Sequence, residues 1–386
     1  MPLRTIDIHI IQSVPPSCIN RGEDGRPKSA IYGGAPRLRV SSQAWKRASR
    51  IHMEQFLPED RRAVRSRRIP TEISDLLDRH QPDNKDFNKV LGAMAYQVTI
   101  GASDTAKGVM LLVGRQVIDN TAEALLTNYA ALRAAYDPKD KKNTKLVEAI
   151  QALNLHAIMH QDRSADVALF GRMVASDKTL TVDASLQVAH AISTHMATTE
   201  TDYFTAVDDL IKDDDEDNGA GMIGDIDFSS GTLYRYASIN LPSLAANLGD
   251  DADFAAVVAA QFAASFAVSM PTGKVNTFAN YTVPALVLVV GREAGAQSYV
   301  GAFERPVRAS ETTGYVDKSI ERLVKHIDEI DSAYGAPGQV IGVLAPGIAP
   351  EKLGELGPRV RTMDELRGLL DQALSTGSSS TADQLA

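Results

Sequence analysis

A short basic segment carries the clearest chemistry in this sequence. Residues 41–50 read SSQAWKRASR, in which neutral hydrogen-bonding side chains come directly before three cations. A serine at the start of an expected helix through about residue 56 can accept a backbone N–H, and a helix N-terminus favours phosphate. Lys46 and Arg50 lie four residues apart and so share one helix face. A solvated amphipathic helix has the same pattern. The candidate anion ligands here are Ser41, Ser42, Gln43, Lys46, Arg47 and Arg50.

Charge is distributed unevenly along the chain. The 386 residues have a net charge of -9, which is unusual for a protein that binds nucleic acid. Residues 1–70 hold 14 Lys and Arg against 6 Asp and Glu, a net of +8, so the rest carries -9 minus 8, or -17. This asymmetry indicates either a local anion-binding surface on an acidic body or a basic solvated face.

Composition excludes several classes of protein. The 44% hydrophobic and 23% charged content is ordinary for a globular protein with a sizeable core. No run of 18 apolar residues occurs, so no membrane partner is expected. The single cysteine, Cys18, rules out an intrachain disulfide and a four-cysteine zinc site. The first residues alternate like a strand rather than a secretion signal, so a cytoplasmic protein is expected.

The elements that must position the basic segment alternate between strand and helix. The period-2 pattern predicts a half-buried strand over residues 5–11 and a second over 37–41, in which Arg37 and Arg39 point outward. Residues 13–31 and 197–230 are expected to be loops, the latter extended and mobile. Helical patterns cover 70–79, 85–101, 114–136, 144–163, 252–270, 315–334 and 363–374, a helical or mixed segment covers 183–196, and strands are expected at 231–241, 274–281, 285–290 and 339–344. This order predicts an α+β fold with a ferredoxin-like or RRM-like core and two excursions.

Three long segments carry a more specific signal. The first reads QSVPPSCINRGEDGRPKSAIYGG followed by RLRVSSQAWKRASR, the second DVALFGRM and QVAHAISTH, and the third DYFTAVDDL and FSSGTLYRYASINL. They lie within residues 4–50, 166–196 and 202–241. In sequence and order they resemble the backbone subunits of type I-E CRISPR Cascade complexes (CasC, the Cas-seven family). Three ordered long motifs are far more specific than one short pattern.

The resemblance implies a hand-like fold and a non-catalytic function. Its expected parts are a palm (1–57, 183–196 and 231–374), helical fingers (58–182), a thumb (197–230) and a disordered tail (375–386). Copies of the subunit would polymerise along the spacer of a CRISPR RNA (crRNA) in antiviral defence. Each thumb would splay one base, and the open guide would pair with target DNA. The implied partners are crRNA, target DNA through the guide, further copies and other Cascade subunits, with no cofactor.

Further RNA ligands follow from the loop and from the matched motifs. Such a subunit must hold any spacer, so phosphates and 2′-hydroxyls are its expected contacts. Arg21 and Lys28 can close over the strand from the loop. In the GRM motif, Met173 can wedge between bases beside Arg172, or it can pack in a core. The remaining candidates are Tyr203, Phe204 and Val207, which stack on bases or pack the thumb, Thr205 on sugar or phosphate, and Lys274, which is otherwise a solvated lysine.

Two other functions compete with the backbone interpretation. A metal-dependent RNA endonuclease of the related type III branch would use a loop carboxylate, such as Glu23 or Asp24, or the acidic run at 208–217. His156 and His160 lack the glutamate of an HExxH zinc site. A generic RRM-like RNA-binding protein would expose aromatic residues on central strands, where Tyr234 and Tyr236 stand.

Overall fold

The computed structural model describes residues 3–101, 109–140, 142–206, 222–310, 312–334 and 338–382. The chain divides into two compact units. The sheet unit comprises Met1–Met53, Gln187–Asn240 and Ala259–Ala386, and the helical unit comprises Glu54–Leu186 and Leu241–Val258. A large sheet together with many helices confirms the predicted α+β class.

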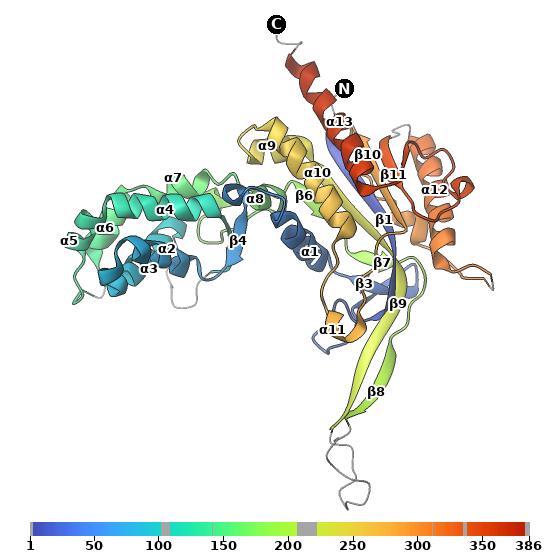
Figure 1. Ribbon diagram of the computed structural model, residues 1–386, viewed down its shortest axis with the longest axis horizontal. Coiled ribbons are helices and arrows are strands. Elements are labelled where there is room, and N and C mark those ends of the chain that lie inside the picture. The colour runs from blue at the N-terminus through green and yellow to red at the C-terminus, as the bar shows by residue number, and fades with distance from the viewer. Residues whose placement is uncertain are drawn as a thin grey trace, which may run out of the picture. The chain divides into compact units, whose positions relative to one another are not determined.

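One mixed sheet organises the sheet unit. In the described part of the chain it has ten strands, in the order β12-β11-β10-β1-β9-β7-β3-β2, with β6 and β8 also paired to β9 (Figure 1). Pairs along this path are antiparallel, except β11 with β12. The strands are β1 Thr5–Ser17, β2 Ser29–Tyr32, β3 Ala35–Val40, β6 Leu186–Val188, β7 Ala191–Ser193, β8 Glu200–Ala206, β9 Met222–Asn240, β10 Leu286–Arg292, β11 Gln339–Leu344 and β12 Arg359–Val360.

Helices cover both faces of the central strands. On one face, the Arg235 guanidinium of β9 lies 3.7 Å from the ring centroid of Trp45 and 4.5 Å from that of Phe266. On the other face, Ile320 and Leu323 pack in one core with β9 and β10. The half-buried strand expected over 5–11 is therefore buried on both sides, because each face has its own layer of helices. The helices of this unit are α1 Ser42–Glu54, α11 Val275–Phe278, α12 Tyr315–Tyr334 and α13 Met363–Ala382, with 3₁₀ turns at Val300–Phe303 and Pro350–Lys352. The helix α10 Ala252–Val268 belongs to this unit from Ala259 onward, and its earlier residues belong to the helical unit.

The helical unit packs short helices around an apolar core of its own. Leu77, Leu91, Leu125, Leu146 and Ile150 are fully buried in that core. A two-stranded antiparallel sheet, β4 Ala63–Ser66 with β5 Leu111–Gly114, accompanies the helices. The helices are α2 Ile69–His80, α3 Lys85–Ile100, α4 Arg115–Thr127, α5 Tyr129–Ala135, α6 Thr144–Ala152, α7 Leu155–His160, α8 Ala165–Phe170 and α9 Leu241–Asn247, with 3₁₀ turns at Glu59–Arg61, Pro82–Asn84 and Lys178–Leu180.

Several sequence-based element assignments are wrong. The segment 183–196, expected to be helical or mixed, contributes the short strands β6 and β7. The strand expected over 274–281 is instead the single helical turn α11. The flanks of the expected loop 197–230 form the strands β8 and β9. Local propensity misassigned 183–196 because its strand β7 pairs with β3 and β9, which lie far away in sequence.

Among the helices that the structure describes, no single one is long and apolar enough to cross a bilayer, although α9 and α10 together have the length and composition of a bent span.

Candidate nucleic-acid interface

The start of α1 is fixed to two other segments of the sheet unit. The Ser41 amide donates to Asn20 Oδ1 at 2.8 Å, and the Ser42 amide donates to His190 Nδ1 at 3.0 Å. Both amides, which were expected to face a phosphate, therefore have protein acceptors. Ser41 is only 6% exposed, so it positions the helix, whereas Ser42 is half-buried and Gln43 is exposed.

The protonation state of His190 follows from this contact. A backbone N–H can only donate, so His190 Nδ1 must accept and the ring is neutral, with its proton on Nε2. Partial burial lowers the pKa of His190, and the nearby Arg39 and Lys28 lower it further. The same interactions place two cations beside the start of α1. His190 lies in a matched motif and was expected to be structural, and Asn20 also lies in a matched motif, but no local pattern pairs either residue with the amides of Ser41 and Ser42.

The loop between β1 and β2 is a compact backbone ladder. The Lys28 amide donates to Asn20 O at 2.9 Å, and the Gly22 amide donates to Arg26 O at 2.8 Å. Arg26 Nε lies 2.8 Å from Asp227 Oδ2 of β9, so the loop is also tied to the hairpin. This framework leaves Arg21 exposed and Lys28 half-buried at the surface.

Gly273 lets a distant cation approach the same loop. A Cβ at Gly273 would come within 2.3 Å of the Ile19 carbonyl oxygen, so only glycine permits this close approach. The following residue, Lys274, has a positive φ of 50° and is half-buried. Burial raises the pKa of the Cys18 thiol, and the charges of Arg21 and Lys274 oppose that rise. The structure thus places Arg21 and Lys274, two of the predicted RNA ligands, near the sulfur of Cys18.

The cations of α1 lie beside its buried stripe. Trp45, Ser49 and Met53 are buried against the sheet unit. Arg47 is exposed, while Lys46 and Arg50 are half-buried, and burial lowers the pKa of Lys46. The long stems of lysine and arginine can lie along an apolar surface while the charged ends reach water. This arrangement gives α1 an exposed basic edge.

The hairpin of β8 and β9 presents one aromatic ring and packs another. Tyr203 lies opposite Asp225 and is 63% exposed, so its ring is free to stack. Phe204 lies opposite Gly224 and is half-buried, and a Cβ on Gly224 would lie 2.6 Å from the Phe204 ring. Thr205 is exposed. Val207 and the acidic run at 208–217 lie outside the described residues.

Arg172 and Met173, the two predicted RNA ligands of the helical unit, differ in exposure: the first is buried and the second is exposed. Arg172 is 4% exposed, and its Nη1 lies 2.7 Å from Asp162 Oδ2. It also donates to the carbonyl oxygens of Leu180 at 3.0 Å and Met159 at 3.2 Å. The prediction that Arg172 contacts RNA conflicts with this burial, because its donors already hold protein acceptors. Met173 is 77% exposed, so core packing does not account for it.

The aromatic platform of a generic RRM-like protein is covered. Tyr234 and Tyr236 are 2% and 7% exposed and lie in one core with α12. His9 stacks on Tyr236 with ring centroids 5.1 Å apart, and burial lowers its pKa to about 3. These rings cannot receive bases while α12 covers them.

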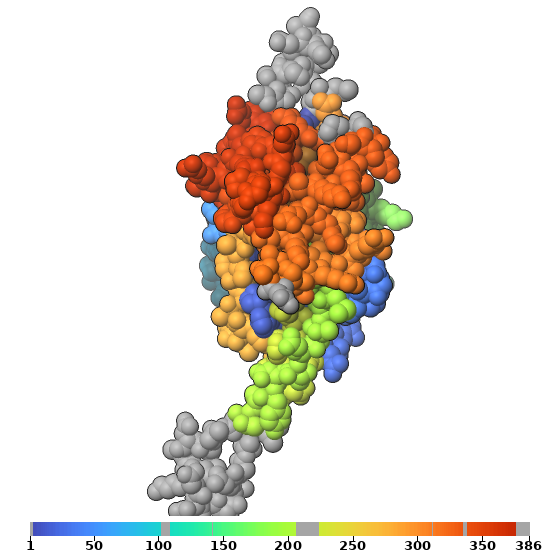
Figure 2. Space-filling view, turned by 90° about the vertical axis from the view of Figure 1, so that its right-hand side faces the viewer, coloured from blue at the N-terminus to red at the C-terminus, as the bar shows by residue number. Residues whose placement is uncertain are grey.

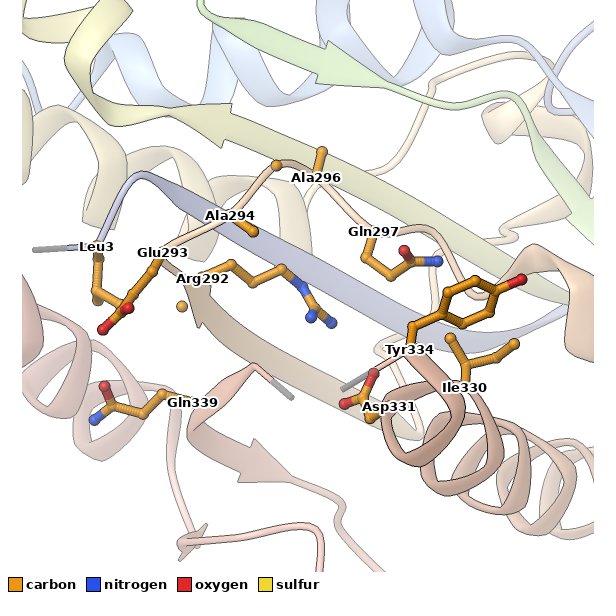
Figure 3. Close-up of a pocket in the computed structure, with 12 residues that line it drawn as sticks. Leu3, Arg292, Glu293, Ala294, Ala296, Gln297, Ile330, Asp331, Tyr334 and Gln339 are labelled. Carbon is orange, nitrogen blue, oxygen red and sulfur yellow. The ribbon is translucent and has the colours of Figure 1, made fainter. Parts of the chain in front are cut away.

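A hollow at the edge of this cluster collects several charged groups. It encloses about 600 Å³ and is lined by residues that include Arg292, Asp331 and Tyr334 (Figure 3). Arg292 Nε lies 2.8 Å from the buried Asp7 Oδ2 and so neutralises it. Burial raises the pKa of Asp7. Hydrogen bonds from Ser238, the Gln297 amide and Arg292 oppose this rise. These groups form a closed structural network.

The structure describes several of the residues that a catalytic alternative would use. Within that part of the chain, no three His, Cys, Asp or Glu side chains gather as a metal site. His156 Nε2 lies 3.0 Å from Asp177 Oδ2, and its ring centroid is 6.4 Å from that of His160. Asp24 Oδ1 accepts the Arg26 amide at 3.1 Å and shapes the loop turn.

Arg37 was expected on the outer face of its strand, and this expectation is wrong. The side chain is fully buried, and its guanidinium donates to the carbonyl oxygens of Ser193 at 2.9 Å and Phe303 at 2.9 Å. Alternation placed Arg37 correctly opposite Leu38, but the outer face is covered by the segment around Phe303.

Comparison with known proteins gives a consistent result. A family model described as "CT1975-like protein" matches residues 6–367. A chain of a solved "CRISPR RNA-guided surveillance complex, pre-nicking" is 31% identical, with a TM-score of 0.76 over 96% of this chain and 100% of that chain. A chain of a "CRISPR RNA-guided surveillance complex" is 27% identical, with a TM-score of 0.62 over 96% and 99%. No curated protein matches this sequence.

Proposed function

The chain belongs to the CT1975-like protein family, and we propose that it is a non-catalytic backbone subunit of a type I-E CRISPR Cascade complex, one that binds guide RNA. Several copies polymerise along the crRNA spacer and present it to target DNA in antiviral defence in the cytoplasm. The proposal is supported by end-to-end similarity to two chains of CRISPR RNA-guided surveillance complexes. Its other partners are the remaining Cascade subunits.

One observation carries the proposal: the basic surface around the start of α1. Its members are Arg21, Lys28, Lys46, Arg47, Arg50 and Lys274, which we call the guide surface. The Asn20 and His190 contacts hold the start of α1, which carries Lys46, Arg47 and Arg50, and Asn20 belongs to the loop that carries Arg21 and Lys28. The close approach at Gly273 brings Lys274 to the same loop, on a chain whose net charge is -9. Cations that touch phosphates bind any spacer sequence, as a repeated guide-binding subunit requires.

The fold supports an assignment of parts to the hand-like architecture. Strands β10, β1, β9 and β7 lie in this order, α1 connects β1 towards β7, and α10 connects β9 to β10. This is the order of an RRM-like palm. The hairpin of β8 and β9 corresponds to the thumb, with Tyr203 exposed near its end, and the helical unit corresponds to the fingers, with Met173 exposed.

The absence of catalysis is part of this proposal. Asp24 shapes the turn of the β1–β2 loop, and Asp7 is neutralised by Arg292. A hydrolytic site needs carboxylates that are free to hold a metal ion. We therefore assign structural roles to Asp24 and Asp7, and the RNA-integrity measurement below tests that assignment.

The test combines the purified protein with crRNA in Mg²⁺ and follows particle mass and RNA integrity together. We expect growth to an ordered multimer with intact RNA. Lys46→Ala/Arg50→Ala should weaken assembly about tenfold or more at ~0.15 M salt, and should flatten the dependence of affinity on salt by about one unit of slope. The matched control is Lys85→Ala/Lys89→Ala, two exposed cations with the same spacing on α3.

Each contrary outcome points to a different function. RNA binding as a monomer would favour a generic RNA-binding module. Metal-dependent cleavage at regular intervals would contradict the non-catalytic assignment and direct attention to Asp24. Equal weakening of assembly by the α3 control would show that the guide surface makes no specific contribution to RNA binding.

A further inference from the structure

A second basic surface lies on the sheet unit, apart from the guide surface. A groove of about 750 Å³ runs between residues 305–308 and α12. Its lining contains five cations, Arg305, Arg308, Lys318, Arg322 and Lys325, against one carboxylate, that of Glu321. Figure 2 shows this side of the unit, with α12 and the segment before it turned to the viewer. Such a concentration of one sign is unexpected on a chain with a net charge of -9.

The groove is built rather than incidental, because side chains hold its rim in place. Arg322 Nη1 donates to Arg305 O at 2.5 Å, and Lys318 Nζ donates to Arg308 O at 3.2 Å. The Val307 amide donates to Thr194 O at 2.9 Å. Carbonyl acceptors orient the cations without neutralising them, so the rim stays basic.

Two carboxylates of α12, those of Asp317 and Glu321, are directed to Lys352, which lies outside the groove. Lys352 Nζ lies 2.5 Å from Asp317 Oδ2 and 3.5 Å from Glu321 Oε1. Lys325 has a 3.7 Å contact with Glu329, where both side chains are more than half exposed. Among the described residues, which leave out Glu311, no carboxylate pairs with the other four groove cations. The positive charge of the groove is therefore largely uncompensated.

The spacing of these cations suits a phosphate backbone. Lys318, Arg322 and Lys325 follow one stripe of α12, and a rise of ~1.5 Å per residue spreads them over about 10 Å. Phosphates on one strand of a duplex advance about 3.4 Å each, so the stripe spans roughly three of them. The lining contains no aromatic ring for base stacking. Recognition here is electrostatic and independent of sequence.

We propose that this groove binds the phosphate backbone of a second nucleic-acid strand while the guide surface holds the guide. This goes beyond the proposed function, in which the protein itself contacts the guide and target DNA is held by pairing with that guide. The groove is linked to the hairpin base, because Val307 pairs with His195, whose Nε2 accepts the Thr232 amide of β9 at 3.0 Å. A nucleic-acid strand that passes the base of the β8–β9 hairpin can therefore continue along the basic groove.

The experiment measures binding of a second strand to protein already saturated with unlabelled guide RNA. Fluorescein-labelled 30-nucleotide single-stranded DNA, single-stranded RNA and duplex DNA, all non-complementary to the guide, are titrated at several salt concentrations. The variant Arg305→Gln/Arg308→Gln/Lys325→Gln removes three exposed charges and leaves Lys318 and Arg322 to hold the rim. The matched control is Arg79→Gln/Lys85→Gln/Lys89→Gln in the helical unit.

We expect the groove variant to bind the second strand about tenfold more weakly and with a salt slope lower by about two, while guide binding and the control stay unchanged. The arm with the largest loss identifies the kind of strand. Unchanged binding of all three strands overturns the inference, as does equal loss in the control. Loss of self-association with unchanged strand binding also overturns it and assigns the groove to an acidic protein surface. Guide binding, measured separately by mass, tests the proposed function independently.

Discussion

Two regions of the sheet unit collect the residue types that bind nucleic acid, and they differ in what covers them. Around the start of α1, cations such as Arg21 and Arg47 are exposed. Below α12, Asp7, His9 and Arg292 form an equally polar group that is buried. The first region rests on backbone contacts that leave Arg21 and Arg47 exposed, whereas the second pairs its charges internally. A charged residue is a ligand or a structural support according to its partners, and the two roles respond oppositely to mutation.

The largest expected effect comes from removing the ion pair between Arg292 and Asp7 in the buried region. Arg292→Ala leaves the Asp7 carboxylate buried without its partner, so we expect a loss of about 3–5 kcal/mol in the free energy of unfolding. Arg47→Ala, on the exposed edge of α1, should change stability by less than about 0.5 kcal/mol and weaken RNA binding. Urea unfolding and RNA titration of both variants make the comparison. Equal stability of the two would show that the buried pair contributes nothing.

A smaller effect appears on acidification. The pKa of His9 falls from 6.5 to about 3 on folding, because burial favours the neutral ring. A lowered folded pKa gives stability that is complete above pH 6.5 and is lost as pH falls towards 3. We expect a loss of about 2 kcal/mol at pH 5. Asp7, whose pKa is raised, acts in the opposite direction, so the decisive measurement is the difference in pH dependence between wild type and His9→Gln. Parallel curves would contradict the assignment.

The smallest expected effect tests whether RNA binding in the exposed region depends on where Gly273 places Lys274. Gly273→Ala places a Cβ against the Ile19 carbonyl and should cost about 1–2 kcal/mol in stability. It should also weaken RNA binding several-fold, because Lys274 and the loop separate. Gly295→Ala, whose Cβ would meet open space, is the control and should change neither quantity. Thermal unfolding and RNA titration test both variants; unchanged RNA affinity in Gly273→Ala would remove Lys274 from the guide surface.

Sequence reasoning was most accurate where a pattern is local. The helix expected over residues 315–334 and the strand over 339–344 match α12 and β11 residue for residue. It was least accurate where partners are distant, as in the turn α11 and the strands β6 and β7. Of the candidate ligands, Arg172 was misplaced because its partner Asp162 gave no signal in the sequence pattern.

The sequence by itself determined the α+β class, the basic N-terminal segment and the family signature, because hydrophobic period, charge and motif order are local properties of the chain. Only the tertiary structure decided which arginines are available. Arg37 and Arg235 are buried, whereas Arg305 and Arg308 line an open groove. A buried charge needs acceptors such as the Phe303 and Phe266 carbonyls, and folding brings these from far along the chain.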